Sequence, residues 1–557
     1  LTAGGAGRIA ARLVVDRVDE GQALSFRLRP TVGINEGFYG LGELFDRPEH
    51  RGTVRAMHLI ADFEMESSYN EAHVPVPFLI GTEGWGLFVE EDHPTVFDVA
   101  ATTSERVEVT TGKGAEATEG FAFHLFTANA ALDVTAHYLA VTGSPAVPAA
   151  WALGPLLWRD ENIDQNEVLD DIETLRALDL PASGIWIDRP YATGVNTFDF
   201  EPSLYPDPAD MVRQANDLGL RVGVWHTPYV SDEDAPDLNA EAESQGYFAP
   251  TTPIIFNHWG KPIDFTNPDA MDWWQDLIGR YTALGIEGYK LDYGEDVVIG
   301  YGGGSTGWVF SDGTDERVMH KGYPRLYHQA YGETLGPDGG FLLCRAGTWG
   351  DQTTTSIIWP GDLDADLSQH RDVRDDGSLA VGGLPAAVSA AVGLGPSGYP
   401  FFGSDTGGYR HSPPSVETFV RWFQHTALSA VMQVGNSSST QPWEILADEP
   451  ELLDLYRDYS RLHLRLFPAL WTQAQDLATG GRPLLRPFGL QEPGWGQHPA
   501  DVYFLGEDLL VAPVVTAGAT TRTFPRPAGD WLAFADGEAL GGTPGDMVTV
   551  DAPLDVL

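Results

Sequence analysis

Short apolar segments recur eight times along the middle of the chain, and this recurrence limits the fold more than any other sequence feature. The segments are Gly154–Trp158, Gly184–Ile187, Arg221–Trp225, Ile286–Leu291, Gly340–Cys344, Ser356–Trp359, Gly398–Phe402 and Val431–Val434. Stretches such as Asn166–Leu178 and Met271–Leu284 lie between them and carry apolar residues at helical spacing. A doubly wound sheet is the alternative, but no glycine-rich phosphate loop follows the first segment. We therefore predict an α/β fold built on a (β/α)8 barrel.

β structure is expected on either side of this barrel. Residues 1–150 contain short Val-, Phe- and Leu-rich runs between turn residues, which predicts an N-terminal β-sandwich domain. These runs are Ala10–Val15, Ala23–Leu28, Trp85–Glu90 and Arg106–Thr110. The catalytic barrel is placed at residues 151–475, with insertions at about 230–264 and 295–324, where the connections are too long for simple barrel loops.

A helical stretch at Glu449–Gln475 ends the predicted barrel, and short apolar runs then return. They are Asp501–Phe504, Leu509–Val515 and Trp531–Ala533. Residues 476–557 are therefore predicted to form a C-terminal β domain, and the lack of turn or cap residues at its end predicts that it is truncated. The start at Leu1 likewise predicts a processed or trimmed N-terminus.

The charge of the chain limits its partners. It carries 80 acidic and 33 basic residues, a formal net charge of −47. Such a surface repels phosphate backbones and anionic lipids, so neither nucleic acid nor membrane is expected as a partner. The excess fits a general bias toward acidic, soluble surfaces, and a single cysteine, Cys344, excludes an intrachain disulfide. We expect a soluble protein, cytoplasmic or secreted, and homo-oligomer formation stays open.

Polar residues follow the predicted strands at their carboxyl ends, where barrel enzymes build their active sites. The residues at these ends are Trp158-Arg159-Asp160, Asp188, His226, Asp292, Arg345, Asp362, Asp405 and Asn436. Helix capping explains any one aspartate, but it explains the set poorly. Carboxylates converging with tryptophans, without a His/Cys cluster at metal-binding spacing, indicate sugar chemistry. Trp158, Trp186, Trp225 and Trp359 offer faces for pyranose rings, although each alone is typical of a core.

Two of the aspartates fit the two carboxyl roles of a glycosidase. Lys290 stands two residues before Asp292, so both side chains face the same side of a strand. The lysine would lower the pKa of Asp292 and keep it ionised, as a nucleophile requires. Asp362 follows a Pro-Gly turn beside Trp359, where a less hydrated carboxyl keeps its proton and acts as general acid. Asp364 and Asp366 lie close by, so chemistry alone does not select Asp362.

At these residues the sequence resembles glycoside hydrolase family 31, the α-glucosidase and α-xylosidase family. The likeness follows the chain in order through Gly40-Leu41-Gly42-Glu43, Tyr69-Asn70, Ile185-Trp186-Ile187-Asp188, Asp264-Phe265-Thr266-Asn267-Pro268, Lys290-Leu291-Asp292-Tyr293-Gly294-Glu295, Arg345-Ala346-Gly347, Trp359-Pro360-Gly361-Asp362, Gly403-Ser404-Asp405-Thr406-Gly407-Gly408 and Gly506-Glu507-Asp508-Leu509-Leu510-Val511-Ala512-Pro513. It implies Asp292 as catalytic nucleophile and Asp362 as general acid/base. It also implies a −1 sugar pocket lined by Asp188, Arg345, Trp359 and Asp405, and double displacement with retention, without metal or organic cofactor.

Departures from the family pattern concern the substrate. Ala72 follows Tyr69-Asn70-Glu71 where typical α-glucosidases of the family have Asp, and Met432–Asn436 lacks their Arg/His pair. His425 lies upstream, in an expected helix, and is not expected to replace it. The Lys-x-Asp-Tyr-Gly-Glu form is similar to the α-xylosidase, α-galactosidase and sulfoquinovosidase branches. Few arginines accompany Arg345, which favours a neutral sugar over a sulfonated one.

The sequence thus predicts a retaining exo-acting α-glycosidase for terminal gluco-, galacto- or xylo-configured sugars, with an oligosaccharide or α-glycoside as substrate. The expected substrate-binding residues are Asp188, Trp225, His226, Lys290, Arg345, Trp359, Asp405 and Asn436. An α-transglycosylase with the same site is an alternative. A non-catalytic carbohydrate-binding protein on a decayed barrel is another, against which the two intact carboxyls count.

Overall fold

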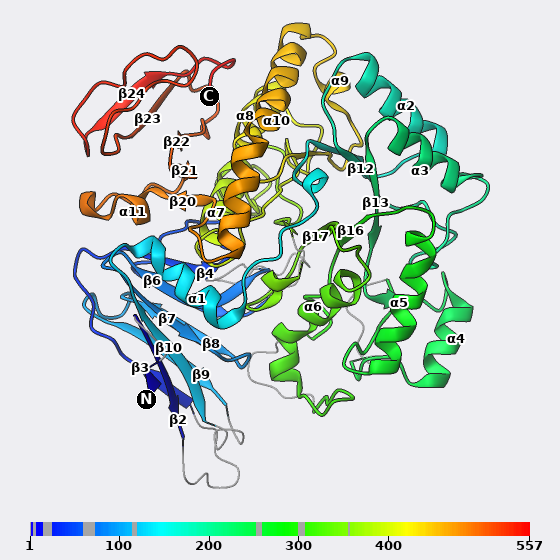
Figure 1. Ribbon diagram of the computed structural model, residues 1–557, viewed down its shortest axis with the longest axis horizontal. Helices are drawn as coiled ribbons and strands as arrows, with labels where there is room; N and C mark the ends of the chain where they lie inside the picture. The colour runs from blue at the N-terminus through cyan, green and yellow to red at the C-terminus, as the bar shows by residue number, and fades with distance from the viewer. Residues whose placement is uncertain are drawn as a thin grey trace.

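The computed structural model describes residues 2–3, 7–14, 25–59, 73–113, 120–251, 259–298, 307–354 and 357–557. Its centre is a parallel sheet in the order β18-β17-β16-β13-β12-β11-β19 (Figure 1). The strands are β11 (Leu156–Arg159), β12 (Gly184–Ile187), β13 (Arg221–His226), β16 (Gly288–Leu291), β17 (Phe341–Cys344), β18 (Ile357–Ile358) and β19 (Gln433–Val434). Parallel bridges from Ile358 to Phe402 and from Asp405 to Gln433 insert one further segment between β18 and β19. The pairing therefore runs around a ring of eight parallel segments, which agrees with the barrel prediction.

The seventh segment is the weakest part of this ring. The segment predicted at Gly398–Phe402 forms isolated bridges instead of a strand. Pro400 interrupts it, and a proline has no N–H to donate to a strand ladder. Ser356, expected to open the sixth segment, lies outside the described residues. The rest of that segment overlaps β18, so seven of the eight predicted segments overlap observed strands.

Helices follow most barrel strands along the chain. They are α2 (Gln165–Ala177), α3 (Pro208–Asp217), α5 (Pro268–Thr282), α6 (Glu316–Gly332), α7 (Leu384–Leu394), α8 (Val416–Ala427), α9 (Pro442–Ile445) and α10 (Pro450–Ala478). Local capping fixes their starts: the Asp164 side chain accepts hydrogen bonds from the first turn of α2, and Asn267 does the same for α5. Within the described ranges, none of the helices combines the length and apolarity needed to cross a membrane.

The two expected insertions differ in the structure. The first contains α4 (Pro236–Gln245) and a small antiparallel pair, β14 (Tyr229–Val230) with β15 (Lys261–Pro262). Helix α6 begins at Glu316, inside the range expected for the second insertion, and includes Pro324. Between β17 and β18, the described residues hold a single 3-10 turn, Asp351–Thr353, in place of a helix.

The N-terminal part consists of two antiparallel sheets, of six and four strands. The first contains β1 (Thr2–Ala3), β2 (Arg8–Leu13), β10 (Phe121–Thr127), β7 (Trp85–Val89), β6 (Pro75–Gly81) and β4 (Phe38–Gly42), and the second β3 (Ser25–Leu28), β9 (Val107–Gly112), β8 (Thr95–Val99) and β5 (Thr53–Met57). Both sheets contribute to one hydrophobic cluster, in which the Phe26 and Phe121 rings stack at 5.2 Å. This packing agrees with the predicted sandwich. Helix α1 (Val134–Thr142) follows it.

The C-terminal part has a sheet of β20 (Leu485–Pro487), β21 (Tyr503–Leu505) and β22 (Leu509–Val511), and a hairpin of β23 (Thr521–Pro525) with β24 (Met547–Asp551). Helix α11 (Phe488–Gln491) lies beside β20 (Figure 1). Trp531–Ala533 was expected as a strand, but only a single bridge at Leu532 forms there. Leu532 is 65% exposed, so its burial contributes little to fixing an extended segment.

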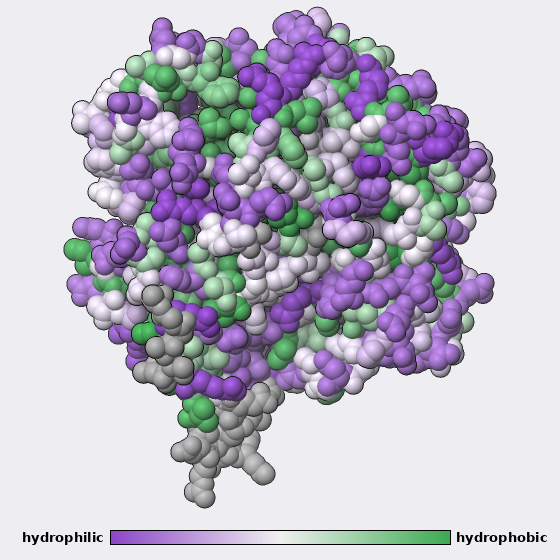
Figure 2. All heavy atoms as spheres, viewed as in Figure 1, coloured by the Kyte–Doolittle hydropathy of each residue, from purple (hydrophilic) through white to green (hydrophobic). Residues whose placement is uncertain are grey.

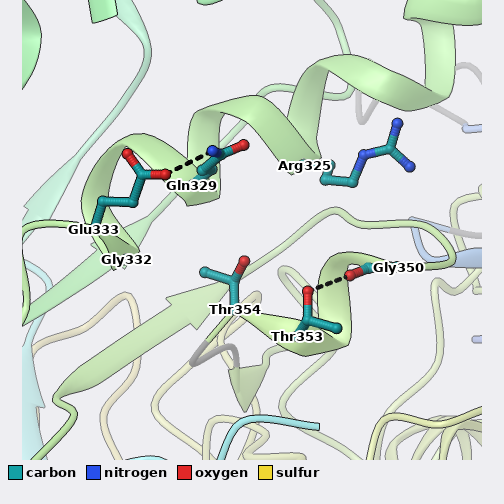
Figure 3. Close-up of a pocket in the computed structure, with 7 residues that line it drawn as sticks. All are labelled: Arg325, Gln329, Gly332, Glu333, Gly350, Thr353 and Thr354. Atoms are coloured by element: carbon teal, nitrogen blue, oxygen red, sulfur yellow. Dashed lines mark hydrogen bonds between the residues drawn. The ribbon is translucent and has the colours of Figure 1, made fainter. Parts of the chain in front are cut away.

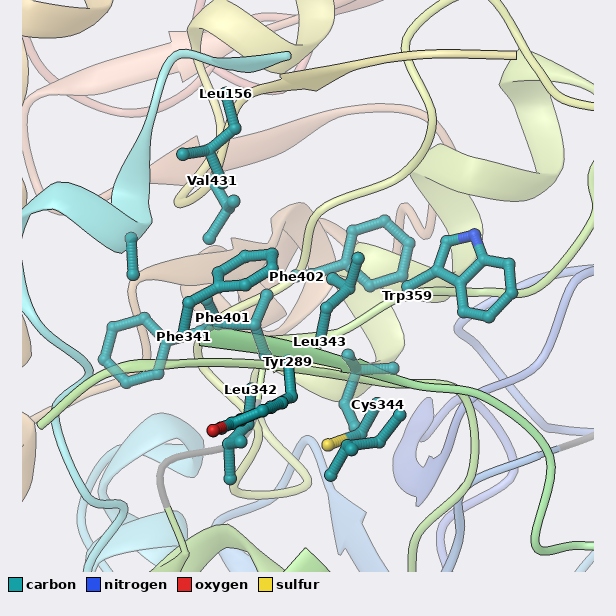
Figure 4. Close-up of a cluster of buried hydrophobic side chains, with 14 of the residues drawn as sticks. Leu156, Tyr289, Phe341, Leu342, Leu343, Cys344, Trp359, Phe401, Phe402 and Val431 are labelled. Carbon is teal, nitrogen blue, oxygen red and sulfur yellow. The ribbon is translucent and has the colours of Figure 1, made fainter. Parts of the chain in front are cut away.

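The barrel core contains large apolar side chains. Figure 4 shows Phe341, Leu343, Phe401, Phe402 and Trp359 gathered around the strands. This core continues into the N-terminal sheet, where Tyr39, Val74 and Phe78 belong to the same buried cluster. The face of the molecule drawn in Figure 2 is mostly hydrophilic, with apolar residues in small groups. The barrel and the N-terminal sheets are therefore packed together as one body of buried side chains.

Candidate active site

Lys290, in β16, lies at the centre of a buried group of acids and aromatic rings. Its Nζ donates a hydrogen bond to Asp188 Oδ2 at 3.0 Å. The same ammonium lies 4.4 to 4.7 Å from the ring centres of Trp158, Trp186 and Trp359. Burial lowers the pKa of Lys290, but the surrounding aspartates outweigh that effect and raise it above the ordinary value. The lysine is therefore a fixed cation in this site.

Asp292 follows β16 directly and is held from three sides. Its Oδ1 lies 3.0 Å from Arg345 Nη1 and accepts the backbone N–H of Tyr293 at 2.9 Å. Its Oδ2 accepts a hydrogen bond from Trp225 Nε1 at 3.0 Å. Burial acts to raise the pKa of Asp292, yet the charges of Arg345 and Lys290 outweigh it, so the pKa lies below its usual value. The carboxyl is thus a buried, oriented anion at neutral pH.

Asp188 and Asp405 have the opposite character. Burial raises the pKa of Asp188 to about 7, although Lys290 opposes the change. Burial likewise raises the pKa of Asp405 to about 8, against Lys290 and a 2.9 Å hydrogen bond from Trp359 Nε1. Its other oxygen accepts a hydrogen bond from Gln433 Nε2 at 3.0 Å. Both groups are therefore available as hydrogen-bond donors or acceptors near neutral pH.

Asp362 is half-buried and follows Gly361, which has φ +79°. Its charge helps to raise the pKa values of Lys290 and Asp405, which places it in the same electrostatic group. Asp364 instead lies 2.8 Å from Arg374 and 2.9 Å from the His411 ring, and Asp366 lies 3.1 Å from Arg374. Asp364 and Asp366 are therefore paired with Arg374, and Asp364 also with His411. The geometry thus favours Asp362 among the three acids.

The structure does not bring two of the expected site residues into this group. His226 is completely buried, with its Nδ1 hydrogen-bonded to the Tyr331 hydroxyl of α6 at 2.8 Å. Because it is next to Trp225 on β13, it faces the opposite side of the strand from the side chain that reaches Asp292. Asn436 instead binds residues 438 and 440 of its own loop. We therefore assign both a structural position.

Sequence reasoning missed three residues of the site. Tyr409 lies under Lys290 at 6.0 Å and donates a hydrogen bond from its hydroxyl to Asp160 Oδ1 at 2.7 Å. Glu295 forms an ion pair with Arg345. Glu43 follows β4. Its burial, together with a smaller contribution from the charge of Glu295, raises its pKa to about 8. Glu43 and Glu295 were visible in the motifs, but a motif alone does not reveal such a contact.

The Tyr69–Ala72 segment, in which Ala72 departs from the family pattern, lies outside the described residues. A separate pocket of about 430 Å³ opens beside α6, and none of the aspartates described above lines it (Figure 3). Arg325, Gln329 and Glu333 line one side, and Thr353 and Thr354 line the other. It lies next to the 3-10 turn that replaces a helix between β17 and β18. None of its lining residues is among those expected from the sequence to bind substrate.

Three family descriptions match the chain in order. The Glycosyl hydrolase 31 N-terminal galactose mutarotase-like domain matches residues 15–98, the Glycosyl hydrolases family 31 TIM-barrel domain residues 145–473, and the Glycosyl hydrolase family 31 C-terminal domain residues 481–557. Among solved structures, a cycloalternan-forming enzyme from Listeria monocytogenes superposes with a TM-score of 0.85 at 23% identity, covering 96% of this chain and 52% of the other. This shows a shared fold.

Curated relatives have several activities. An isomaltosyltransferase of Sporosarcina globispora is 24% identical over 94% of this chain and 50% of its own length. An alpha-xylosidase of Emericella nidulans is 26% identical over 91% and 63%, and a sulfoquinovosidase of Agrobacterium fabrum 28% over 87% and 72%. The chain spans half of the length of the first of these relatives and less than two thirds of the second. The barrel description alone covers more than half of the sequence, so the chain belongs to glycoside hydrolase family 31.

Proposed function

We propose that the chain is a retaining, exo-acting α-glycosidase that removes terminal α-linked neutral sugars of gluco-, galacto- or xylo-configuration. The observation that carries this proposal is the environment of Asp292, whose two carboxyl oxygens are held by Arg345 and Trp225 beside the buried Lys290. An ionised carboxylate fixed in this way suits attack on an anomeric carbon. We also propose that the chain divides into domains at residues 1–150, 151–475 and 476–557, and the three family matches support this division.

The reaction proceeds in two displacements. Asp292 attacks the anomeric carbon while Asp362 gives its proton to the glycosidic oxygen, whose bond to the sugar breaks. Asp362, now a carboxylate, takes a proton from water, and that water attacks the glycosyl–Asp292 ester and releases the sugar with its original configuration. A cycloalternan-degrading enzyme of Trueperella pyogenes, with a TM-score of 0.83 and 24% identity, has been solved in complex with a covalent intermediate.

The sugar pocket is assigned to the residues around Lys290. Asp188 and Asp405, with their raised pKa values, would bind sugar hydroxyls, and Trp359 would cover an apolar ring face. Both cations of the cluster already face carboxylates: Lys290 faces Asp188, and Arg345 faces Asp292 and Glu295. This internal compensation favours an uncharged sugar over an anionic one.

Transfer to a second sugar is the other candidate, and the match to an isomaltosyltransferase supports it. The covalent intermediate would then be resolved by an acceptor hydroxyl in place of water. Product analysis separates the two reactions: the share of transfer product is measured as a neutral oligosaccharide acceptor is raised. Hydrolysis predicts that free sugar remains the main product at all acceptor concentrations.

A glycoside panel tests the proposal directly. Nitrophenyl α-glucoside, α-galactoside, α-xyloside and α-N-acetylgalactosaminide are supplied to the purified protein and to its Asp292→Ala and Asp362→Ala variants. Asp217→Ala, at an exposed position of α3, serves as the matched control. We expect turnover of at least one glycoside, its loss in the two variants alone, and the α anomer as first product by NMR. Wild-type rates in both variants, or a β anomer formed first, would refute the proposal.

A further inference from the structure

Glu43 is a buried acid that the N-terminal sheet brings to the barrel. It follows β4, and its side chain is completely buried. The turn before it is fixed to the barrel because the Gly42 N–H donates to Ser397 Oγ at 3.0 Å. Its Oε2 accepts the His73 backbone N–H at 3.3 Å, whereas Oε1 has no hydrogen-bond partner within the described part of the chain. A buried carboxyl in this condition is better suited to a neutral acid than to an anion.

His73 links Glu43 to the loops that contain the proposed catalytic residues. Its ring Nδ1 lies 3.9 Å from Glu43 Oε2, and its carbonyl accepts the Gly347 N–H at 3.0 Å. A Cβ at Gly361 would lie 3.2 Å from His73 Cε1 and 3.3 Å from Arg345 Cδ. The missing side chain of Gly361 therefore lets His73 and Arg345 meet at the turn that precedes Asp362. Any larger residue there would displace one of them.

Glu43 also lies in the electrostatic surroundings of Glu295, the partner of Arg345. That guanidinium pairs with Asp292 through Nη1 and with Glu295 through Nη2. Burial raises the pKa of Glu295, and the Glu295 charge in turn contributes to the raised pKa of Glu43. A further anion at Glu43 would repel Glu295, the carboxylate that pairs with Arg345. An uncharged Glu43 leaves the pairs of Arg345 with Asp292 and Glu295 undisturbed.

We propose that Glu43 and His73 are positioning residues, through which the N-terminal domain holds Arg345 and the Gly361 turn and so aligns Asp292 with Asp362. This inference rests on the catalytic roles proposed above for the two aspartates. Glu43 acts as a neutral hydrogen-bonding group, because among the described contacts Oε2 accepts the His73 N–H and Oε1 has no hydrogen-bond partner. The N-terminal domain is then part of the active site and does more than cover the barrel.

The groups that face Asp292 determine how the inference appears in a pH profile. Lys290 comes from β16, Arg345 follows β17, and Tyr293 and Glu295 lie in the loop after Asp292. The charge of Asp362 acts on the same Tyr293. Loosening Arg345 would weaken the main cationic contribution and raise the pKa of Asp292. The acid limb of kcat/KM would then move to higher pH.

The test compares Glu43→Ala, Glu43→Gln and His73→Ala in the full chain. We expect Glu43→Ala and His73→Ala to lower kcat by about 10- to 100-fold, as small displacements of catalytic groups do, and to move the acid limb upward. Glu43→Gln, an uncharged isostere, should retain near-wild-type kcat and acid limb. If Glu43→Ala fails to fold, Glu43→Leu fills the same volume without polar atoms. Glu36→Ala is the control, because Glu36 is a buried acid of the same region whose partner is Trp85.

A second readout does not depend on turnover. The difference in melting temperature between Asp292→Asn and its parent, followed against pH, reports the pKa of Asp292 in the folded protein. In the Glu43→Ala background, the pH at which the two melting temperatures begin to differ (the onset) should be higher. An unmoved onset and acid limb would overturn the inference, as would equal shifts in Glu36→Ala. Absence of turnover with the onset moved would instead refute the proposed glycosidase activity and support the positioning role.

Discussion

The ammonium nitrogen of Lys290 lies 3.0 Å from Asp188 Oδ2, and the two side chains are 4% and 3% exposed. A buried pair of this kind contributes little net stability by itself, because both ions have lost their hydration. Removing one partner is costly, since the other charge then stays buried alone. The pair therefore joins β12 and β16 at the point where the proposed sugar pocket begins.

Replacing Lys290 by Met should destabilise the protein strongly at neutral pH. Breaking a buried pair typically costs about 3–5 kcal/mol, and Asp188 would lose its cation. The pKa of Asp188, already raised to about 7, would rise further, so the carboxyl would protonate and the loss would be smaller at pH 5 than at pH 8. Thermal unfolding at both pH values measures the effect. Lys261→Met is the control, because its pair with Glu243 at 3.5 Å is largely exposed. Equal losses in the two variants would contradict the prediction.

Much of the barrel could be predicted because its strands are buried on both faces. β12 and β17 are apolar runs without alternation, which is the pattern of a parallel sheet covered by helices. β16 is buried along its whole length as well, although it includes Lys290. Segments that form isolated bridges instead of strands were harder to predict. The seventh segment has the right composition, but Pro400 limits it to bridges. In Trp531–Ala533, Trp531 packs against Phe504 whereas Leu532 is exposed, and a single bridge forms.

The site could be predicted only as far as strand ends locate it. Asp188, Asp292 and Asp405 follow strands or bridged segments, and the structure groups their charges around Lys290. Only the structure shows which of two neighbouring residues faces the site. Trp225 and His226 are adjacent, so only one of them could face the barrel mouth. Glu43 lies far from Glu295 in the sequence, and an interaction between such distant residues leaves no local pattern.

The pairing of Arg345 predicts an acid-limb shift in Arg345→Lys. A lysine cannot reproduce the fork that contacts Asp292 and Glu295 together. Burial would then raise the pKa of Asp292 with less opposition, and the acid limb of kcat/KM should move up by about 1 pH unit or more. A pH series with an aryl α-glycoside measures it. Arg159→Lys, which breaks a similar fork with Asp171, should lower stability and leave the limb in place. A shift in that control would argue against a specific role for Arg345.

Asp405 predicts a pH-dependent change in stability. Burial raises its pKa to about 8, whereas an unfolded aspartate titrates near about 3.9. The folded state thus holds this proton more tightly, so the contribution of Asp405 is present below about pH 4 and is lost as pH rises to about 8. The melting temperature of Asp405→Asn relative to wild type should therefore rise over this range. Asp217→Asn, at an exposed position, should show a constant difference. A flat or falling difference in Asp405→Asn would refute the assignment.

The role of Asp362 predicts a dependence on the leaving group. In Asp362→Asn, glycosides with poor leaving groups should lose about 10²–10⁴-fold in rate, because their oxygen needs a proton. Nitrophenyl glycosides should lose less in the first step, because nitrophenolate departs without one. Their slow step becomes hydrolysis of the intermediate, and added azide should restore turnover and give an α-glycosyl azide. Asp366→Asn is the matched control, because this acid is bound by Ser368 and Arg374 within its own loop. A uniform loss across leaving groups would assign the proton to another residue, since only the group that donates it responds to the basicity of the departing oxygen.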